Sequence, residues 1–350
     1  MKIDILCNDG SPLGVTMKDL WGKGSRGIGI GGSEYGLLTV AEGLVNAGHD
    51  VRLYNDPKEA DASPFEQLPI RAFDPTESRD VIVTFRSPNP RSIVSKGLKV
   101  WWSCDQYTIG SFKDFACHMD RIVCISPFHE NHFKVAYGIT GVDVIDIPVR
   151  IEDFDLVSEE PVIPKRCIFT SVPDRGLQLL RPVWSRLKMR EPDASLVITS
   201  DYRLWGLPDP RNEQHRMGWM NMPDVYFVGA VPRMELLLQQ AMAQLLLYPC
   251  VYDELFCVAV AEAESMGVIP ITSTTGALAT TNMGDLISGD PKNLSGFGNQ
   301  MVDLAIGYMN NPSLYGQKSK ELMVKSRERF SVGNIIRKWE KVLENEDMLD

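Results

Sequence analysis

Short apolar runs of strand length alternate with helical patterns along most of the chain. Residues 2–6, 51–54 and 81–85 have the apolar character of buried strands. Residues 33–47 form a helical pattern between the first two, and the same alternation resumes near residue 167. Neighbouring parallel strands need a crossover connection, usually a helix, so this rhythm predicts parallel sheets covered by helices on both faces. We therefore expect an α/β protein.

The composition of the chain shifts between residues 151 and 164, where acidic residues and prolines gather in the segment EDFDLVSEEPVIP. A chain of 350 residues is long enough for two domains of ordinary size, and we interpret this segment as the interdomain linker. It predicts an N-terminal Rossmann-like domain over residues 1–155, a C-terminal one over residues 156–328, and a final helical segment over residues 329–350. Ligands of such doubly wound sheets bind at the carboxyl ends of the strands.

Charge and cysteine content exclude several classes of partner. The formal net charge is −10 and the pI is near 5.1, which argues against nonspecific binding to nucleic acid or to an acidic membrane surface. We expect no membrane span and no signal peptide, because no segment approaches about 20 apolar residues. The seven cysteines are odd in number and lie mostly in apolar segments, as in a reduced protein, so we expect a cytoplasmic location.

Two glutamates, Glu254 and Glu262, lie eight residues apart in a segment that we expect to be functional. Glu262 lies within the apolar run Phe256–Met266, which reads as a buried helix ending at Gly267, and a carboxylate there is costly without a partner. Eight helical residues span about 12 Å, so the two acids could hold separate groups of one elongated, hydroxyl-rich ligand such as a nucleotide sugar. A solvated Glu254, or a Glu262 paired with a buried arginine, is the structural alternative.

Residues 27–32 contain a formal GxGxxG, and Asp56 follows the second strand, as in dinucleotide-binding oxidoreductases. That fingerprint needs the glycines directly after the first strand, which here ends near Cys7. We instead expect Gly31 and Gly32 to lie at a helix N-terminus, where backbone N–H groups can meet a phosphate. A flexible loop with a glycine cap is the simpler alternative.

Four segments in the expected order resemble the retaining GT-B glycosyltransferases, a family that includes sucrose synthase, glycogen synthase and bacterial mannosyltransferases. The last of them contains the pattern that resembles the E-x7-E motif of that family. The resemblance implies two Rossmann-like domains facing each other across a cleft, with a C-terminal helix, carrying Phe330 and Trp339, that crosses back to the first domain. The four segments are residues 31–54, 121–139, 171–199 and 253–276.

The resemblance also implies roles for individual residues. Glu262 would bind the ribose hydroxyls of a nucleotide-sugar donor, and Glu254, counted among the catalytic residues, would bind hydroxyls of the transferred sugar. Arg175 would neutralise the diphosphate. The backbone of Phe256-Cys257-Val258 would lie at the pyrophosphate, at the start of a helix, and Gly31 and Gly32 would lie near the distal phosphate.

Two departures from the family pattern concern the chemistry. Cys104 stands where the family often has a histidine, beside Asp105, and His118 is a candidate to replace that histidine as a catalytic residue. The earlier of two basic residues that precede the second-domain helix is also missing. Candidates to replace it are Lys165, Arg166, Arg86 and Arg203.

We therefore predict a metal-independent transferase that moves a hexosyl group from a nucleotide-diphosphate sugar to the hydroxyl of a glycan, lipid or small molecule, with retention and without a cofactor. Asp153-Phe154-Asp155 has the form of a metal-binding DxD, but it falls in the expected linker. Residues 200–203 and 228–233 are candidate walls for the donor base. A nucleotide-sugar 2-epimerase of the same fold and a non-catalytic nucleotide-sugar or glycan-binding protein remain alternatives.

Overall fold

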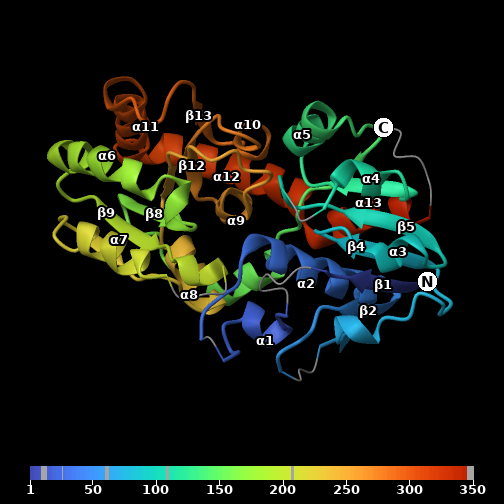
Figure 1. Cartoon of the computed structure of the whole chain (residues 1–350). Helices are drawn as coiled ribbons and strands as arrows, with labels where there is room; N and C mark the ends of the chain where they lie inside the picture. The colour runs from blue at the N-terminus through green and yellow to red at the C-terminus, as the bar shows by residue number, and fades with distance from the viewer. Residues whose placement is uncertain (9–13, 26, 60–62, 108–109, 206–208, 345–350) are drawn as a thin grey trace. The chain divides into compact units, whose positions relative to one another are not determined.

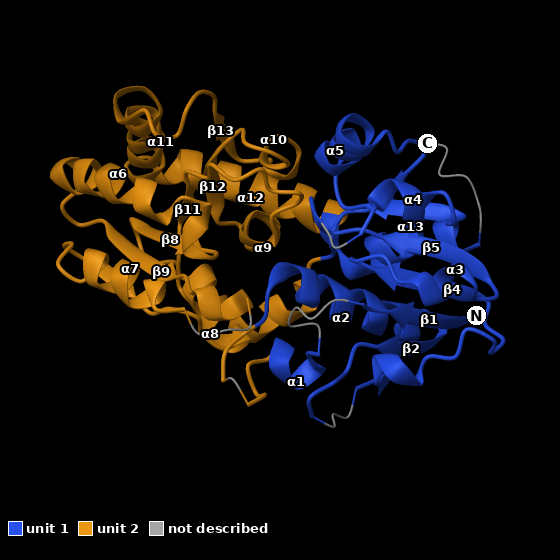
Figure 2. Cartoon of the chain, viewed as in Figure 1, with its two compact units in different colours: residues 1–20, 30–148, 330–350 blue, residues 21–29, 149–329 orange. Residues whose placement is uncertain are grey.

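The structure is a computed structural model, and it describes the chain except for residues 9–13, 26, 60–62, 108–109, 206–208 and 345–350. The chain forms two compact units, each with its own parallel sheet (Figures 1 and 2). The first unit comprises residues 1–20, 30–148 and 330–350, and the second comprises residues 21–29 and 149–329. The α/β fold expected from the alternating pattern is confirmed in both units.

The first unit is built on a seven-stranded sheet of order β3-β2-β1-β4-β5-β6-β7, with every described pairing parallel. The central strand β4, with sequence VIVTF, is buried along its whole length, as a strand covered on both faces must be. The strands are β1 (Lys2–Leu6), β2 (Asp50–Tyr54), β3 (Glu66–Leu68), β4 (Val81–Phe85), β5 (Leu98–Trp102), β6 (Arg121–Cys124) and β7 (Asp143–Val144). The helices are α1 (Met17–Leu20), α2 (Gly32–Asn46), α3 (Pro90–Ile93), α4 (Phe112–Ala116), α5 (Pro127–Tyr137) and α13 (Val332–Leu343), with a 3-10 turn, η1 (Ile70–Ala72).

The second unit is built on a six-stranded parallel sheet of order β10-β9-β8-β11-β12-β13. The strands are β8 (Arg166–Thr170), β9 (Ser195–Thr199), β10 (Val225–Phe227), β11 (Leu245–Tyr248), β12 (Ile269–Ser273) and β13 (Asp285–Ile287). The helices are α6 (Leu177–Arg190), α7 (Arg211–Trp219), α8 (Arg233–Ala241), α9 (Val258–Met266), α10 (Leu278–Thr281), α11 (Asn299–Met309) and α12 (Pro312–Phe330). Tighter or wider turns are η2 (Ile151–Val157), η3 (Pro173–Arg175), η4 (Tyr202–Trp205) and the π-helical η5 (Leu294–Gly298).

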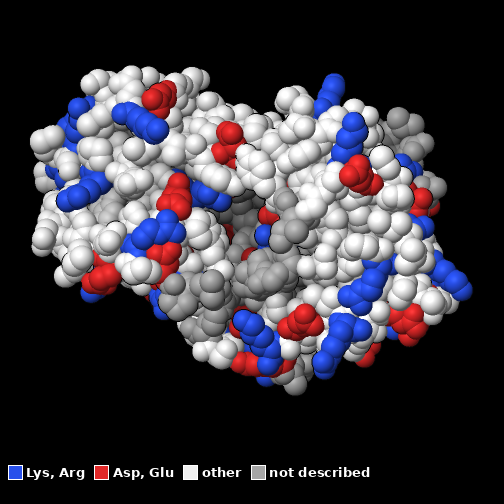
Figure 3. All heavy atoms as spheres, in the orientation of Figure 1, with Lys and Arg blue, Asp and Glu red and all other residues white. Residues whose placement is uncertain are grey.

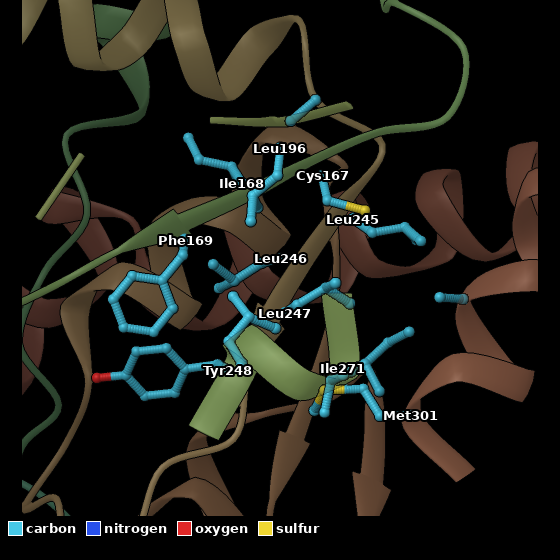
Figure 4. Packing of buried hydrophobic residues seen from close by; sticks show 14 of the residues in the cluster. Cys167, Ile168, Phe169, Leu196, Leu245, Leu246, Leu247, Tyr248, Ile271 and Met301 are labelled. Atoms are coloured by element: carbon cyan, nitrogen blue, oxygen red, sulfur yellow. The ribbon is translucent and has the colours of Figure 1, made fainter. Parts of the chain in front are cut away.

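The core of the second unit brings a polar group to the carboxyl edge of its sheet. Figure 4 shows the apolar side chains of β8 and β11 packed together, with Phe169 beside Tyr248. These two rings stack with centroids 5.5 Å apart, so the Tyr248 ring is fixed while its hydroxyl lies at the end of β11. The packing therefore delivers an oriented hydroxyl to the edge where ligands of parallel sheets bind.

Three local features differ from what the sequence predicts or were not visible in it. The helix that carries Glu262 begins at Val258 and not at Phe256, because Cys257 has a left-handed φ of 87° that a helix cannot accommodate. Residues 151–157, within the stretch interpreted as a linker, form η2 in the second unit. Residues 21–29 also group with that unit, and the Gly29 N–H donates to the Val231 carbonyl at 2.9 Å.

Candidate active site

Arg175 and Glu254 form an ion pair at the carboxyl edge of the second unit's sheet. Arg175 ends η3 after β8, Glu254 lies between β11 and α9, and β8 and β11 are neighbours in the sheet, so the fold brings the two residues together. The Arg175 Nε lies 3.0 Å from Glu254 Oε1. The guanidinium also lies 3.4 Å from the ring centroid of Tyr252, a cation–π contact that holds it over the ring.

The surroundings of Glu254 define its protonation behaviour. Burial raises the pKa of the Glu254 carboxyl above its ordinary 4.5, while Arg175 and the Tyr248 hydroxyl oppose that rise. Tyr248 donates to Glu254 Oε1 at 2.8 Å and lies 3.1 Å from Ser171 Oγ, which is free to donate in turn. The side chain of Glu254 is only 14% exposed, so the alternative of a solvated loop acid does not describe it.

Glu262 has the buried arginine partner that the structural alternative anticipates. Arg233, the first residue of α8, lies with its Nη1 2.9 Å from Glu262 Oε1. Arg233 Nε also lies 2.7 Å from Asp153 Oδ2, which in turn accepts from Arg150 Nε at 3.1 Å. Asp153 is thus held by arginines and is buried, which accounts for the first acid of the DxD-like segment.

The start of α9 offers backbone donors beside this pair of acids. Cys257 is the N-cap of α9, no side chain caps the helix, and its first turn contains no acidic residue. The first N–H groups of a helix have no intrahelical partner, so this end can receive an anion. Burial raises the pKa of the Cys257 thiol well above its ordinary value, so the thiol stays neutral. The groups that Cys257 and Val258 offer to an anion at this helix end are those of the backbone.

In the first unit, Asp105 is held by an arginine at the carboxyl ends of neighbouring strands. Arg86 follows β4 and Asp105 follows β5. Arg86 binds both oxygens of Asp105, with Nε–Oδ2 at 2.7 Å and Nη2–Oδ1 at 3.1 Å, and its Nη1 lies 3.3 Å from Glu34 Oε1. Glu34 lies in the first turn of α2, whose N-cap is Gly31 and whose first residue is Gly32. The structure thus brings Asp105 and the glycine end of α2 to one cluster, organised by Arg86.

His118, the predicted replacement for the missing histidine, and the buried His129 have different environments. His118 is exposed and follows α4, and no hydrogen bond or ion pair described in the structure joins its ring to Asp105. His129 on α5 is fully buried, and its Nδ1 accepts from the Ile125 N–H at 3.4 Å. Burial lowers the pKa of His129 to about 3, so its ring is neutral at physiological pH. The role of His118 stays a prediction.

The four candidates for the missing basic residue lie in different places. Lys165 and Arg166 are at the amino end of β8, which is the opposite end from Arg175, and Lys165 pairs with Glu191 at 2.7 Å. Arg86 is bound to the first-unit carboxylates described above. Arg203 pairs with Asp201 at 2.6 Å at the carboxyl end of β9. Of the three candidates in the second unit, only Arg203 lies at the carboxyl edge.

A cavity of about 560 Å³ in the second unit includes parts of both walls predicted for the donor base. Its lining includes Asp201 and Arg203, which follow β9, and Phe227, Val228 and Gly229, at and after the end of β10. Asp201 is buried and accepts hydrogen bonds from Arg203 and Asn212, which fixes the polar side of the cavity. The remaining lining residues are Asp209, Pro210, Asn212, Glu213 and Arg216.

The described residues contain no group of three or more histidine, cysteine, aspartate or glutamate side chains arranged to hold a metal ion. None of the helices described here has the length and apolar character that a membrane crossing requires. On the visible face of each unit, basic and acidic side chains are interspersed and do not gather in a broad patch of one sign (Figure 3).

The chain resembles several solved glycosyltransferase structures. The sucrose-phosphate synthase of Thermosynechococcus elongatus matches with a TM-score of 0.71 and 15% identity over 99% of each chain. A glycosyltransferase from Rickettsia africae matches with a TM-score of 0.71 and 14% identity over 98% of each chain. Anabaena HepE in complex with UDP matches with a TM-score of 0.68 and 15% identity over 99% of this chain and 100% of that one. No protein-family model and no curated protein matches the sequence. The likeness shows the GT-B fold.

Proposed function

We propose that this protein is a glycosyltransferase that moves a hexosyl group from a nucleotide-diphosphate sugar to an acceptor hydroxyl. The observation that carries the proposal is the Arg175–Glu254 pair beside the uncapped N-terminus of α9. One edge of the sheet thus presents a cation, backbone donors and a carboxylate, which suit a diphosphate joined to a sugar. The GT-B fold supports the same conclusion, and Anabaena HepE, one of the structural neighbours, has been solved with UDP-glucose.

In the proposed donor complex, Arg175 and the backbone of Phe256-Cys257-Val258 bind the pyrophosphate. Glu262 accepts the ribose hydroxyls, and Glu254 accepts hydroxyls of the transferred sugar. The cavity beside Asp201 and Arg203 takes the base. Fixed donors aimed at the leaving diphosphate meet the main electrostatic demand of the reaction.

Transfer breaks the bond between the anomeric carbon and the diphosphate oxygen and forms a bond from that carbon to the acceptor oxygen. We propose retention of the anomeric configuration, with the acceptor proton passing to the departing phosphate oxygen. In the first unit, Gly31 and Gly32 lie near the distal phosphate, Asp105 contacts the reacting sugar, and His118 serves the acceptor. No step of this scheme uses a metal ion or a cofactor, and the acceptor is a glycan, a lipid or a small molecule.

The test compares binding with turnover in two isosteric variants. Glu262→Gln should weaken the affinity for UDP by about 10- to 100-fold, because charge-assisted hydrogen bonds to the ribose are lost. Glu254→Gln should reduce turnover of UDP-glucose far more than the affinity for UDP, since the bare nucleotide lacks the sugar. Calorimetry gives the affinities, and release of UDP with and without sugar acceptors gives the turnover.

Three results would contradict the proposal. The first is the absence of binding to uridine, guanosine and adenosine diphosphates alike. The second is an equal loss of binding and turnover in Glu254→Gln, which would remove its role at the sugar. The third is conversion of the donor to an epimer without acceptor, which would identify an epimerase of the same fold.

A further inference from the structure

Four charged side chains form a continuous chain of ion pairs inside the second unit. They alternate in sign, in the order Glu262, Arg233, Asp153 and Arg150. The N–O distances along the chain are 2.9, 2.7 and 3.1 Å. None of the four side chains is more than 13% exposed. Buried charges of this kind persist only when they are paired, so this series of ion pairs is a specific structural arrangement and not a surface contact.

The position of Arg233 is not explained by the stability of its own helix. Arg233 is the first residue of α8, and a cation at a helix N-terminus is disfavoured by the helix dipole. Its guanidinium is instead directed to carboxylates on two other elements, Glu262 on α9 and Asp153 in η2. Arg233 therefore connects α8, α9 and η2 through its fork of donors.

Asp153 belongs to the DxD-like segment and acts here as an anchor for Arg233. Its Oδ2 accepts from the Nε of both Arg233 and Arg150, whereas Asp155 is exposed. The Nε of Arg233 is thereby fixed, and its Nη1 is left to reach Glu262. A carboxylate with two arginine partners serves the arginines, so the segment needs no metal ion to account for its acid.

The ion pair occupies only part of the acceptor capacity of Glu262. Arg233 binds Oε1, and within the described part of the chain Oε2 accepts no hydrogen bond. An ionised carboxylate offers about four acceptor sites on its two oxygens. A glutamate clamped on one oxygen by a rigid guanidinium therefore presents the other in a fixed orientation. Two adjacent hydroxyl groups, as in a ribose, match such an acceptor.

We propose that Arg233 is a positioning residue that orients Glu262 toward a vicinal diol, with Asp153 as its anchor, and so makes the site selective for ribonucleotides. This inference rests on the proposed function, because it assigns the diol to the ribose of the donor. Arg233 does not touch the ligand. Its contribution is to hold Glu262, so its loss should reduce discrimination between nucleotides with and without ribose hydroxyls.

The test measures the ratio of two affinities by calorimetry. The ligands are UDP and 2′,3′-dideoxy-UDP, which differ only in the two hydroxyls. The wild-type protein should prefer UDP by about 10- to 100-fold, as expected for hydrogen bonds to a charged group. Arg233→Met should reduce that preference to about twofold or less, and Asp153→Asn should reduce it partly. Arg233→Lys, which keeps the charge, should retain more of the preference than Arg233→Met.

The affinity for 2′,3′-dideoxy-UDP should stay within about threefold in all variants, because the phosphate contacts do not involve Arg233. A purely structural role would instead lower both affinities together and leave their ratio unchanged, and that result would overturn the inference. If Arg233→Met does not fold, the affinity ratio of Asp153→Asn tests the inference in its place.

Arg190→Met is the matched control, because Arg190 forms an exposed pair with Asp303 and its substitution should leave both affinities unchanged. A wild-type protein that binds neither nucleotide would contradict the proposed function. If the wild-type protein prefers UDP and the Arg233 and Asp153 variants keep the same preference, only this inference is contradicted.

Discussion

At the scale of single residues, the second unit keeps its candidate ligand-binding acids buried beside cations. Glu254 is held by Arg175, and Glu262 is held by Arg233. Burial disfavours the charge on the Arg175 guanidinium, but Glu254 together with Tyr248, Tyr252 and Cys250 raises the pKa of Arg175 above its ordinary value. The guanidinium is therefore charged before any ligand arrives. A diphosphate would compete with Glu254 for Arg175 and leave Glu254 free to accept sugar hydroxyls.

Arg175→Gln should lower the affinity for UDP by about 10- to 100-fold and leave the affinity for uridine nearly unchanged, because only the phosphates need the cation. The double variant with Glu254→Gln separates this loss from the effect of an unpaired Glu254, and it should bind UDP no better than Arg175→Gln alone. Calorimetry with UDP and uridine measures both quantities. Arg190→Gln, on the exposed face of the same unit, is the control. A parallel loss of uridine binding would mean that Arg175 supports the fold and not the phosphates.

The individual site residues could be recognised in the sequence, but their partners could not. Glu262 stands out because an apolar run surrounds it, and Glu254 stands out because it precedes Glu262 by eight residues in a segment that resembles the E-x7-E motif. Arg233 lies 29 residues from Glu262 along the chain, and Asp153 lies 80 residues from Arg233. Such pairs are created by the sheet order and the crossing of helices, which a single sequence does not display. For the same reason, Tyr248 reads as an ordinary apolar strand residue until its hydroxyl is seen beside Glu254.

At the scale of elements, α9 carries a second glutamate, Glu264, that the local pattern does not distinguish. Glu264 is fully buried, and its Oε1 accepts from the Met283 N–H at 2.5 Å. Among the described residues, its Oε2 has no hydrogen-bond partner. Burial raises the pKa of Glu264 from 4.5 to about 8, against the opposing effect of the backbone N–H groups of Met283 and Gly284. Glu264 is therefore mainly a neutral acid at physiological pH.

The protonation of Glu264 makes stability depend on pH in a defined direction. Between about pH 4.5 and 8 the folded protein keeps a proton that the unfolded chain has lost, so rising pH favours unfolding. One pKa unit corresponds to about 1.4 kcal/mol. The free energy of unfolding above pH 8 is therefore lower than that below pH 4.5 by at most about 5 kcal/mol from this group. Glu264→Gln cannot ionise and keeps an acceptor for Met283. It should flatten the fall in unfolding free energy between pH 5 and 9, as measured by denaturant titration.

The control for this prediction is Glu321→Gln. Glu321 is exposed on α12, and its hydrogen bond from Lys325 lowers its pKa below 4.5, so it does not titrate between pH 5 and 9. This control should keep the wild-type pH dependence. An equally steep fall in Glu264→Gln would show that another group causes it.

Strands with a buried apolar pattern could be predicted from the sequence, whereas short edge strands could not. Strands β1 and β4 match the predicted ranges of residues 2–6 and 81–85 because most of their residues are apolar and buried. The edge strands β3, with sequence EQL, and β7, with sequence DV, have no such pattern, and their pairing depends on the neighbouring strand. The predicted start of α9 lies two residues before the observed one. Cysteine in a sequence does not indicate the positive φ of 87° that Cys257 adopts at the end of the loop before the helix. In each case the missing information is tertiary.

At the scale of the whole molecule, the chain passes between the two units at four points, after residues 20, 29, 148 and 329. Each unit nevertheless has its own sheet and core. The first unit is completed by the end of the chain, because α13 packs against α2 and the ring of Trp339 lies 5.0 Å from that of Trp102. Ile336 also lies against Gly43, where a Cβ would approach it to 2.7 Å, so the fit of α13 on α2 depends on this glycine.

The last prediction uses this division of the chain. Trp339→Ala should destabilise the first unit by about 3–5 kcal/mol, because it removes a large buried side chain next to Trp102. The affinity for UDP should be preserved, since the residues proposed to bind it belong mainly to the second unit. Differential scanning calorimetry should show one transition lowered by the substitution, and UDP should raise the other, because a ligand stabilises the unit that binds it. Arg337→Ala, an exposed neighbour on α13, is the control and should change neither transition. Loss of UDP binding in Trp339→Ala, or an equal fall of both transitions, would show that the two units fold as one and that the donor site depends on the C-terminal helix.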